Sequence, residues 1–111
     1  MQDFNIIHKL GTPFYLIEEN KLRNNLSILA DLQEKANIKI LFALKSFANT
    51  TILPIISQYL YGGAASSLYE ATLINKCFKQ KAHTFSPTFS RKDFEQIATL
   101  SDYIIFNSIK Q

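Results

Sequence analysis

The chain has 111 residues, of which 47% are hydrophobic and 19% are charged, and its formal net charge is +3. This composition predicts one globular domain rather than a disordered chain. The lysines are scattered, with Lys76, Lys79 and Lys81 as the densest group, so we expect no nucleic-acid partner. No apolar run approaches the ~20 residues of a membrane-spanning helix, so no membrane partner is expected.

The cysteine count and the first residues indicate the cellular compartment. Cys77 is the only cysteine, so it cannot form an internal disulfide, which is typical of a reducing compartment. The opening MQDFNIIHKL lacks the basic region and apolar stretch of a signal peptide. We therefore predict a cytoplasmic protein. No group of histidine, cysteine and acidic residues has the spacing of metal ligands, so no metal site is predicted.

The first two predicted elements are a short strand and a long helix. Residues 12–17 (TPFYLI) are rich in β-branched and aromatic residues, as strands are. The stretch ENKLRNNLSILADLQEKAN follows, with apolar residues at the spacing of one helical face. These residues are Leu22, Leu26 and Leu29. Asn20 is the expected N-cap of this helix, and Asn37 is its expected end.

The next stretch, KILFALKSFANT (residues 39–50), predicts a strand that ends on a lysine. Its continuous apolar run is typical of a parallel strand that is covered on both faces. The helix TTILPIISQYL follows, with Thr50 or Thr51 as its expected cap. Pro54 would then lie in the first turn, where a proline costs little.

Two further strand–helix units and a final strand complete the pattern. YGGAASS is a strand of small residues, which lets another backbone or a ligand come close. Ser67–Glu70 has the pattern of a capping box, as has Ser90–Asp93, and each opens a helix. The strands KAHTFSP and DYIIFNS follow these two helices.

Strands and helices that alternate in this way predict βαβ units and a parallel sheet. The pattern alone fits both an open doubly wound sheet and part of a (β/α) barrel. A closed (β/α)₈ barrel takes roughly 250 residues, more than twice the length of this chain. No glycine-rich phosphate loop follows a predicted strand, so nucleotide binding has no support.

Ligand sites in parallel α/β folds lie at the C-terminal ends of the strands, where Lys45 stands. One interpretation is a lysine whose stem lies along the rim and whose ammonium is in solvent. The other is an amine that reacts covalently with an aldehyde. Ser66, Ser86 and Asn107 also end strands, and such residues are often caps or turn formers. Their shared position predicts that some of them line one pocket with Lys45.

Four segments carry a resemblance to a known family. TPFYLIEENKLRNNL, ILFALKSFA, GGAASSLYEA and FSPTF occur in this order. Together they resemble the N-terminal part of carboxynorspermidine and carboxyspermidine decarboxylases, from about Thr12 to the end of the chain. ALKSFA and ASSLYEA are fairly specific to that group, whereas the wider alanine racemase-like barrel enzymes share TPxY and xALK.

The resemblance implies an α/β fold, the N-terminal portion of a (β/α)₈ barrel that binds pyridoxal 5′-phosphate, here incomplete. Residues 1–111 would form one such portion, with a strand over 12–17 leading in and four βα units, or parts of them, between 38 and 108. Lys45 would carry the cofactor, with Ser66, Ser86 and Asn107 as further cofactor-binding residues. The complete enzyme would be a homodimer.

The implied reaction is that of a lyase in polyamine biosynthesis, which decarboxylates carboxynorspermidine or carboxyspermidine to norspermidine or spermidine. The strand YGGAASS lacks the acid that relatives acting on ornithine carry, which disfavours ornithine. The family's phosphate loop and substrate-binding acids have no counterpart in these residues, so the chain alone is expected to be inactive. The alternatives are another alanine racemase-like protein, and a non-enzymatic remnant or interaction piece of a split barrel.

Overall fold

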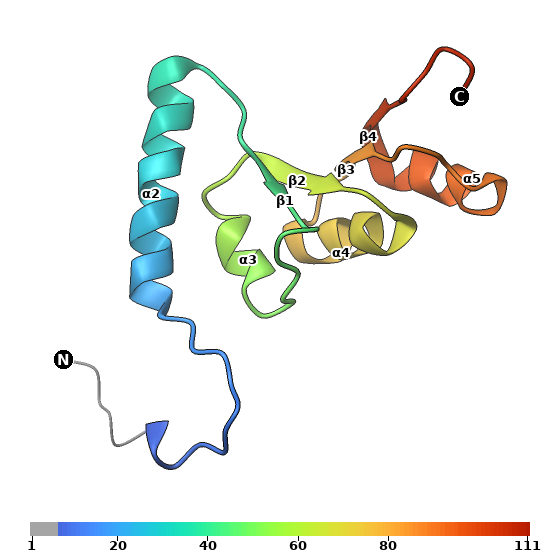
Figure 1. Ribbon diagram of the computed structural model, residues 1–111. Coiled ribbons are helices and arrows are strands. Elements are labelled where there is room, and N and C mark those ends of the chain that lie inside the picture. The colour runs from blue at the N-terminus through green and yellow to red at the C-terminus, as the bar shows by residue number, and fades with distance from the viewer. Residues whose placement is uncertain (1–6) are drawn as a thin grey trace.

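The computed structural model describes residues 7–111, and it shows a parallel sheet covered by helices on one face (Figure 1). The elements are α2 (Glu19–Ala36), β1 (Leu41–Ala43), α3 (Leu53–Ile56), β2 (Gly62–Ala65), α4 (Leu68–Phe78), β3 (Ala82–Phe85), α5 (Arg91–Leu100) and β4 (Ser101–Ile105). The strands lie in the order β1-β2-β3-β4, and all neighbouring pairs are parallel. The predicted α/β alternation and incomplete barrel are confirmed.

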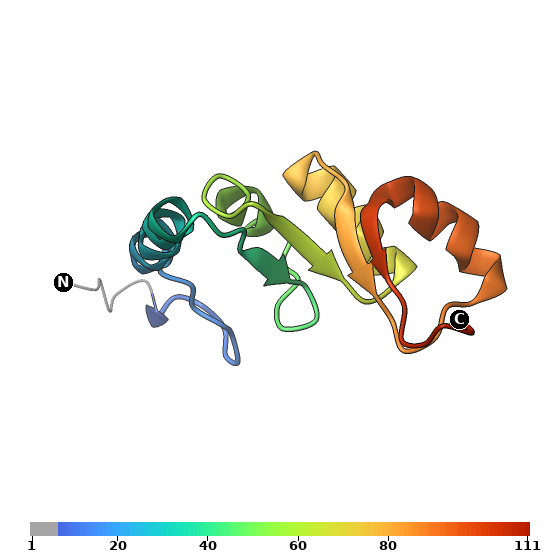
Figure 2. The ribbon, with the colours of Figure 1, turned by 90° about the horizontal axis from the view of Figure 1, so that it is seen from above.

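The two faces of the sheet differ. Seen from above, α2, α3, α4 and α5 succeed one another along the outer side of the strands (Figure 2). The core lies between these helices and the sheet, where Leu53, Ile56 and Ile74 are almost fully buried. No helix of the described residues covers the other face.

The register decides which side chains share the uncovered face. Ala43 is paired with Ala64, Ala64 with His83, and His83 with Tyr103. Because alternate residues of a strand point to opposite faces, these four side chains share a face. Thr84, between His83 and Phe85, is fully buried against the helices. Phe85 therefore also points to the uncovered face.

The predicted strand over residues 12–17 is wrong. These residues form no strand, and Tyr15 is fully exposed. A strand needs a neighbour that completes its hydrogen bonds, and no described segment pairs with residues 12–17. The aromatic and β-branched composition of the segment was therefore not sufficient. The last strand also differs from its prediction, because β4 covers Ser101–Ile105 and not residues 102–108.

The helix ends confirm some expected caps and correct others. Asn37 adopts the left-handed conformation that ends α2, but the N-cap of α2 is Glu18 and not Asn20. At α3, the Asn49 side-chain oxygen accepts hydrogen bonds from the backbone of residues 51 and 52, so neither threonine is the cap. Ser90 is the N-cap of α5, but its side chain accepts no hydrogen bond there.

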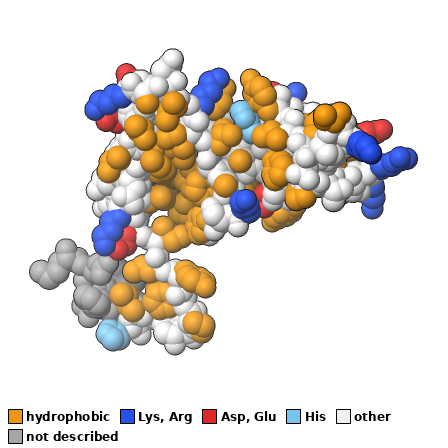
Figure 3. Space-filling model, turned by 45° about the horizontal axis from the view of Figure 1, so that its top comes forward, with side chains coloured by type: hydrophobic (Ala, Val, Ile, Leu, Met, Phe, Trp, Pro, Cys, Tyr) orange, Lys and Arg blue, Asp and Glu red, His pale blue; other side chains and the backbone are white. Residues whose placement is uncertain are grey.

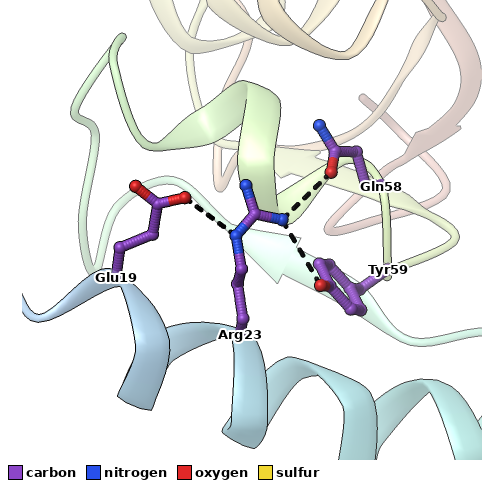
Figure 4. Close-up of polar contacts among 4 residues, drawn as sticks. All are labelled: Glu19, Arg23, Gln58 and Tyr59. Carbon is purple, nitrogen blue, oxygen red and sulfur yellow. Dashed lines mark hydrogen bonds and ion pairs between the residues drawn. The ribbon is translucent and has the colours of Figure 1, made fainter.

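A polar cluster joins α2 to the end of α3 (Figure 4). The Arg23 guanidinium donates to Glu19 Oε1 at 2.8 Å, to Gln58 Oε1 at 3.2 Å and to the Tyr59 hydroxyl at 3.3 Å. The hydrogen bond to Tyr59, and then the one to Glu19, raises the pKa of Arg23 further above its ordinary value. The cluster fixes α2 against the segment that leads into β2.

The Gln33 side chain of α2 fixes the entrances of two strands. Its Oε1 atom accepts hydrogen bonds from the backbone of Ile40 at 2.9 Å and of Tyr61 at 3.0 Å. Its Nε2 atom donates to the carbonyl oxygen of Tyr59 at 2.9 Å. One side chain thus satisfies three backbone groups just before β1 and β2, which aligns these strands.

Among the helices of residues 7–111, none is long and apolar enough to cross a membrane.

Candidate functional site

A hollow of about 150 Å³ lies at the C-terminal edge of the sheet. Its lining residues are Ala43, Lys45, Ala64, Ala65, Ser66, Glu70 and Phe85. They come from the ends of β1, β2 and β3 and from the first turn of α4. The three alanines contribute only methyl groups, so the floor of the hollow is apolar and leaves space above the strands. Its polar groups are an amine, a hydroxyl and a carboxylate.

Lys45 is placed at this edge by the way β1 ends. The Leu44 amide donates to the Ala64 carbonyl at 3.1 Å, as the last ladder bond, and the Leu44 side chain is buried in the core. The chain then turns, because the amides of Ser46 and Phe47 donate back to residues 43 and 44. Lys45 stands on this turn with an exposed side chain. Its ammonium has no hydrogen bond or ion pair within residues 7–111.

Ser66 and Glu70, which also line the hollow, form a hydrogen-bonded pair. The Ser66 amide donates to Glu70 Oε2 at 2.6 Å, and the Ser66 hydroxyl donates to the same oxygen at 2.8 Å. The Glu70 amide donates to the Ser67 hydroxyl at 3.2 Å. Half of the predicted capping box therefore forms: the Ser67 hydroxyl accepts from the Glu70 amide, whereas the Glu70 carboxylate accepts from Ser66 and not from the amide of the cap residue.

Glu70 is a site residue that the sequence reasoning missed. The capping-box pattern assigned it only a role in starting α4. A helix that follows a strand begins at the C-terminal edge of a parallel sheet, so the acid in its first turn lies at that same edge. The position of Glu70 in the first turn of a helix that follows a strand could therefore have been read from the sequence. The consequence is that an anionic group and the Lys45 amine line the same hollow.

The other two predicted site residues lie elsewhere on the edge. Ser86 borders a second hollow of about 180 Å³, which Ser66 also lines, and its hydroxyl donates to the Thr88 carbonyl at 2.6 Å. Asn107 is exposed and lines neither hollow, and its backbone amide donates to Gln111 Oε1 at 2.7 Å. The structure thus brings Lys45 and Ser66 together, and Ser66 and Ser86, but it does not bring all four residues to one pocket.

His83 lies on the uncovered face, outside both hollows. Its ring centroid is 4.5 Å from that of Tyr103 and 6.1 Å from that of Tyr61. Burial lowers the pKa of His83, Asp102 raises it, and Lys39 lowers it, so that the net effect is a lowered pKa. The Lys39 ammonium itself lies 4.4 Å from the centroid of the Tyr61 ring. These contacts describe a structural histidine.

Protonation of His83 is expected to destabilise the fold as the pH falls below the ordinary histidine value of 6.5. Because its pKa is lowered in the folded state, the unfolded chain binds the proton first. The stabilisation is complete above that value and is lost as the pH falls towards the lowered pKa. Urea midpoints measured between about pH 8 and pH 5 should fall less in His83→Phe, which keeps a ring between the tyrosines. Equal falls in both proteins would assign the pH dependence to other groups.

Residues 7–111 contain no group of three or more histidine, cysteine, aspartate or glutamate side chains that could hold a metal ion. The hollow at the edge of the sheet offers an amine, a carboxylate and a hydroxyl group. An exposed primary amine beside an apolar floor can bind an aldehyde covalently.

Comparisons with known proteins give a consistent result. No family model matches the chain. It is 42% identical over 103 residues to a carboxynorspermidine/carboxyspermidine decarboxylase of Campylobacter jejuni, covering 93% of this chain and 27% of that protein. It is 36% identical over 102 residues to the protein of the same name from Herminiimonas arsenicoxydans, covering 92% of this chain and 28% of that protein. It is 37% identical over 105 residues to a carboxyaminopropylagmatine decarboxylase of Synechocystis, covering 95% of this chain and 27% of that protein.

A solved structure shows the same similarity. The crystal structure of carboxynorspermidine decarboxylase from Campylobacter jejuni, complexed with norspermidine, superposes with a TM-score of 0.88 at 41% identity. The match covers 92% of this chain and 28% of that protein chain. The predicted resemblance is therefore confirmed: the chain matches the N-terminal part of enzymes named as decarboxylases, and it spans just over a quarter of their length.

Proposed function

We propose that the chain supplies the lysine-bearing part of a pyridoxal 5′-phosphate-dependent decarboxylase that acts on a carboxylated polyamine. The observation that carries the proposal is the position of Lys45. Its amine stands at the C-terminal edge of a parallel sheet, has no polar partner in the described chain, and borders an apolar hollow. The decarboxylases that the chain resembles supply the reaction type.

The residues of the hollow fit the aldehyde end of this cofactor. Lys45 would hold the aldehyde carbon covalently and release it when the substrate amine takes its place. Ala43, Ala64 and Ala65 would leave room for a flat ring above the strands. When bound, the cofactor supplies an electron sink for the loss of CO₂. Lys45 is the only cation that lines the hollow, so the phosphate would be held by groups beyond the described residues.

The remaining polar residues of the edge are assigned to positioning. Ser66, held through its amide and hydroxyl by Glu70, would border the cofactor directly. Ser86 and Asn107 follow the next two strands and would lie farther along the same edge of the sheet, outside the hollow that Lys45 lines. Glu70 would place a negative charge near the amines that enter and leave. Its two hydrogen bonds hold that carboxylate in position.

The proposed substrate is a class of compounds. The three relatives are named for carboxynorspermidine, carboxyspermidine and carboxyaminopropylagmatine, which share a carboxyl group on a polyamine chain. The strand β2 offers only glycine and alanine at the site, with no acid in the strand itself. A homodimer of complete barrels and a cytoplasmic location belong to the same proposal.

A chimaera tests this function. Residues 1–111 would replace the matching N-terminal part of the Campylobacter jejuni enzyme, and the product would be treated with pyridoxal 5′-phosphate and borohydride. We expect release of CO₂ from carboxynorspermidine and a single reduced adduct that maps to Lys45. The 111-residue chain alone should show no turnover. An adduct on another lysine, or a folded chimaera without turnover, would reject the assignment.

A second candidate is a non-enzymatic interaction piece. Within residues 7–111, the two outer strands of the sheet, β1 and β4, are each paired on one side only, which favours this possibility. Unpaired strand edges are templates for association with another chain. A chimaera that folds but leaves Lys45 unmodified by the cofactor would favour the interaction piece over the enzyme.

A further inference from the structure

The Ser66 hydroxyl has a hydrogen-bond partner that fixes its proton. It donates to Glu70 Oε2 at 2.8 Å, and the same oxygen accepts from the Ser66 amide at 2.6 Å. A hydroxyl has one proton and two acceptor lone pairs, whereas an ionised carboxylate only accepts. While this bond is present, Ser66 can donate to no other group, and it offers only lone pairs to the hollow that it lines.

The Glu70 carboxylate has a second oxygen that is still available. Its Oε1 atom accepts no hydrogen bond and forms no ion pair within residues 7–111. The cap of α4 is supplied by another residue, because the Ser67 hydroxyl accepts from the Glu70 amide. The carboxylate bonds instead to Ser66, the residue after β2, and lines the hollow together with Lys45.

The polar groups of the hollow match a ligand that donates hydrogen bonds. Ser66 and Glu70 contribute acceptors, and alanines form the apolar floor beside them. A primary ammonium group has three donors and no acceptor. Hydrogen bonds from an ammonium to a carboxylate are among the strong ones, because both partners are charged. The hollow therefore favours an ammonium group that is joined to an aliphatic chain.

Long-range attraction does not account for the binding of such a ligand. The 111 residues carry a formal net charge of +3, so as a whole they do not attract a cation. Acidic side chains are few and separated on the face shown in Figure 3, where hydrophobic side chains cover much of the surface. A local pair of acceptors is thus the feature that would hold an ammonium group.

We infer that Ser66 and Glu70 form the docking site for the primary ammonium group of the polyamine substrate. The inference rests on the proposed function, in which the substrate amine replaces Lys45 on the cofactor aldehyde. An amine that does so must reach the carbon that Lys45 holds, so it must dock in the same hollow. Within the described residues, Ser66 and Glu70 are the only acceptor side chains that line this hollow. The Ser66 hydroxyl and Glu70 Oε1 would each accept one N–H.

Binding of norspermidine to the chimaera tests the docking site without turnover. Norspermidine is the ligand in the crystal structure of the Campylobacter jejuni enzyme, and it carries a primary amine at each end. In isothermal titration calorimetry, Glu70→Gln should raise its Kd at least about 10-fold. Glutamine keeps the length of glutamate, and its oxygen still accepts from Ser66. The variant therefore removes the charge and keeps the contact.

Ser66→Ala and Ser67→Ala form a matched pair of variants. Each removes one hydroxyl at the start of α4, but only Ser66 lines the hollow with Lys45. Ser66→Ala should raise the Kd for norspermidine at least about 5-fold, because one acceptor is lost. Ser67→Ala should lower the melting temperature, because it removes the cap of α4, and it should keep the parental Kd.

Steady-state kinetics separate docking from a general loss of structure. Glu70→Gln should raise the KM for carboxynorspermidine at least about 10-fold and change kcat much less, whereas a disturbed edge of the sheet would lower kcat. A parental Kd in Glu70→Gln or Ser66→Ala, with the borohydride adduct on Lys45 retained, would overturn the docking site and leave the proposed function standing.

Two further outcomes also count against the docking site. An equal rise of the Kd in Ser67→Ala would overturn it, because the loss of the helix cap would then be responsible. A parent chimaera that forms no adduct on Lys45 is a distinct result, which rejects the proposed function and the docking site with it.

Discussion

Replacing Lys45 by arginine in the chimaera is expected to lower turnover by at least about 10³-fold and to remove the borohydride-reducible adduct. Arginine keeps the positive charge and nearly the length of the lysine side chain. Its guanidinium stays protonated at all accessible pH values, so it has no free electron pair for an aldehyde. The side chain lies on an exposed turn, so the substitution should leave the fold intact. Loss of the adduct would then report chemistry and not unfolding.

The matched control is Lys39→Arg. Lys39 stands just before β1, whereas Lys45 stands just after it, and both side chains are exposed. The Lys39 ammonium lies against Tyr61, away from the hollow, and donates to the Tyr61 hydroxyl at 3.1 Å. An arginine there should preserve both turnover and the adduct. An arginine at position 45 that left full turnover would end the assignment of Lys45.

The position of Lys45 was predictable because a continuous apolar run and a charged end mark a buried parallel strand and its terminus. The absence of a strand over residues 12–17 was not predictable, because strand formation depends on a partner that local composition does not specify. The roles of Gln33 and Glu70 also depend on distant backbone groups and on the placement of a helix. Asn107 was predicted to end the last strand, but it follows β4, its backbone amide donates to Gln111 Oε1, and it does not line the hollow.

The small residues of β2 also show that a residue's role depends on elements that are distant in the sequence. Their sequence predicted a close approach by a backbone or a ligand. In the structure, Gly63 points to the helices, and Ile74 of α4 fills the space where its side chain would be. A Cβ atom at Gly63 would lie 2.7 Å from Ile74 Cγ1 and 2.8 Å from Ile74 Cδ1. The glycine thus serves helix–sheet packing, and the alanines that follow it leave space at the hollow.

Gly63→Ala is expected to lower the free energy of unfolding by about 1–3 kcal/mol. Ile74 is fully buried, so it cannot move away from the added methyl group without disturbing the core. Gly63 does not have a positive φ, so the cost is steric and does not come from backbone strain. Denaturant unfolding of the parent and the variant measures it. Gly62→Ala is the control, because its Cβ would meet only the outer ends of side chains, Gln80 Nε2 at 3.2 Å and Leu41 Cδ2 at 3.3 Å. Its loss should be smaller.

A double-mutant cycle identifies the cause. Ile74→Ala alone should cost about 2–5 kcal/mol, because it leaves a cavity beneath β2. In that background, Gly63→Ala places its methyl group in the vacated space, so its cost should vanish or become a gain. The double variant should therefore be more stable than the sum of the single losses by about 1–3 kcal/mol. Additive losses would mean that contact with Ile74 is not what requires a glycine at position 63.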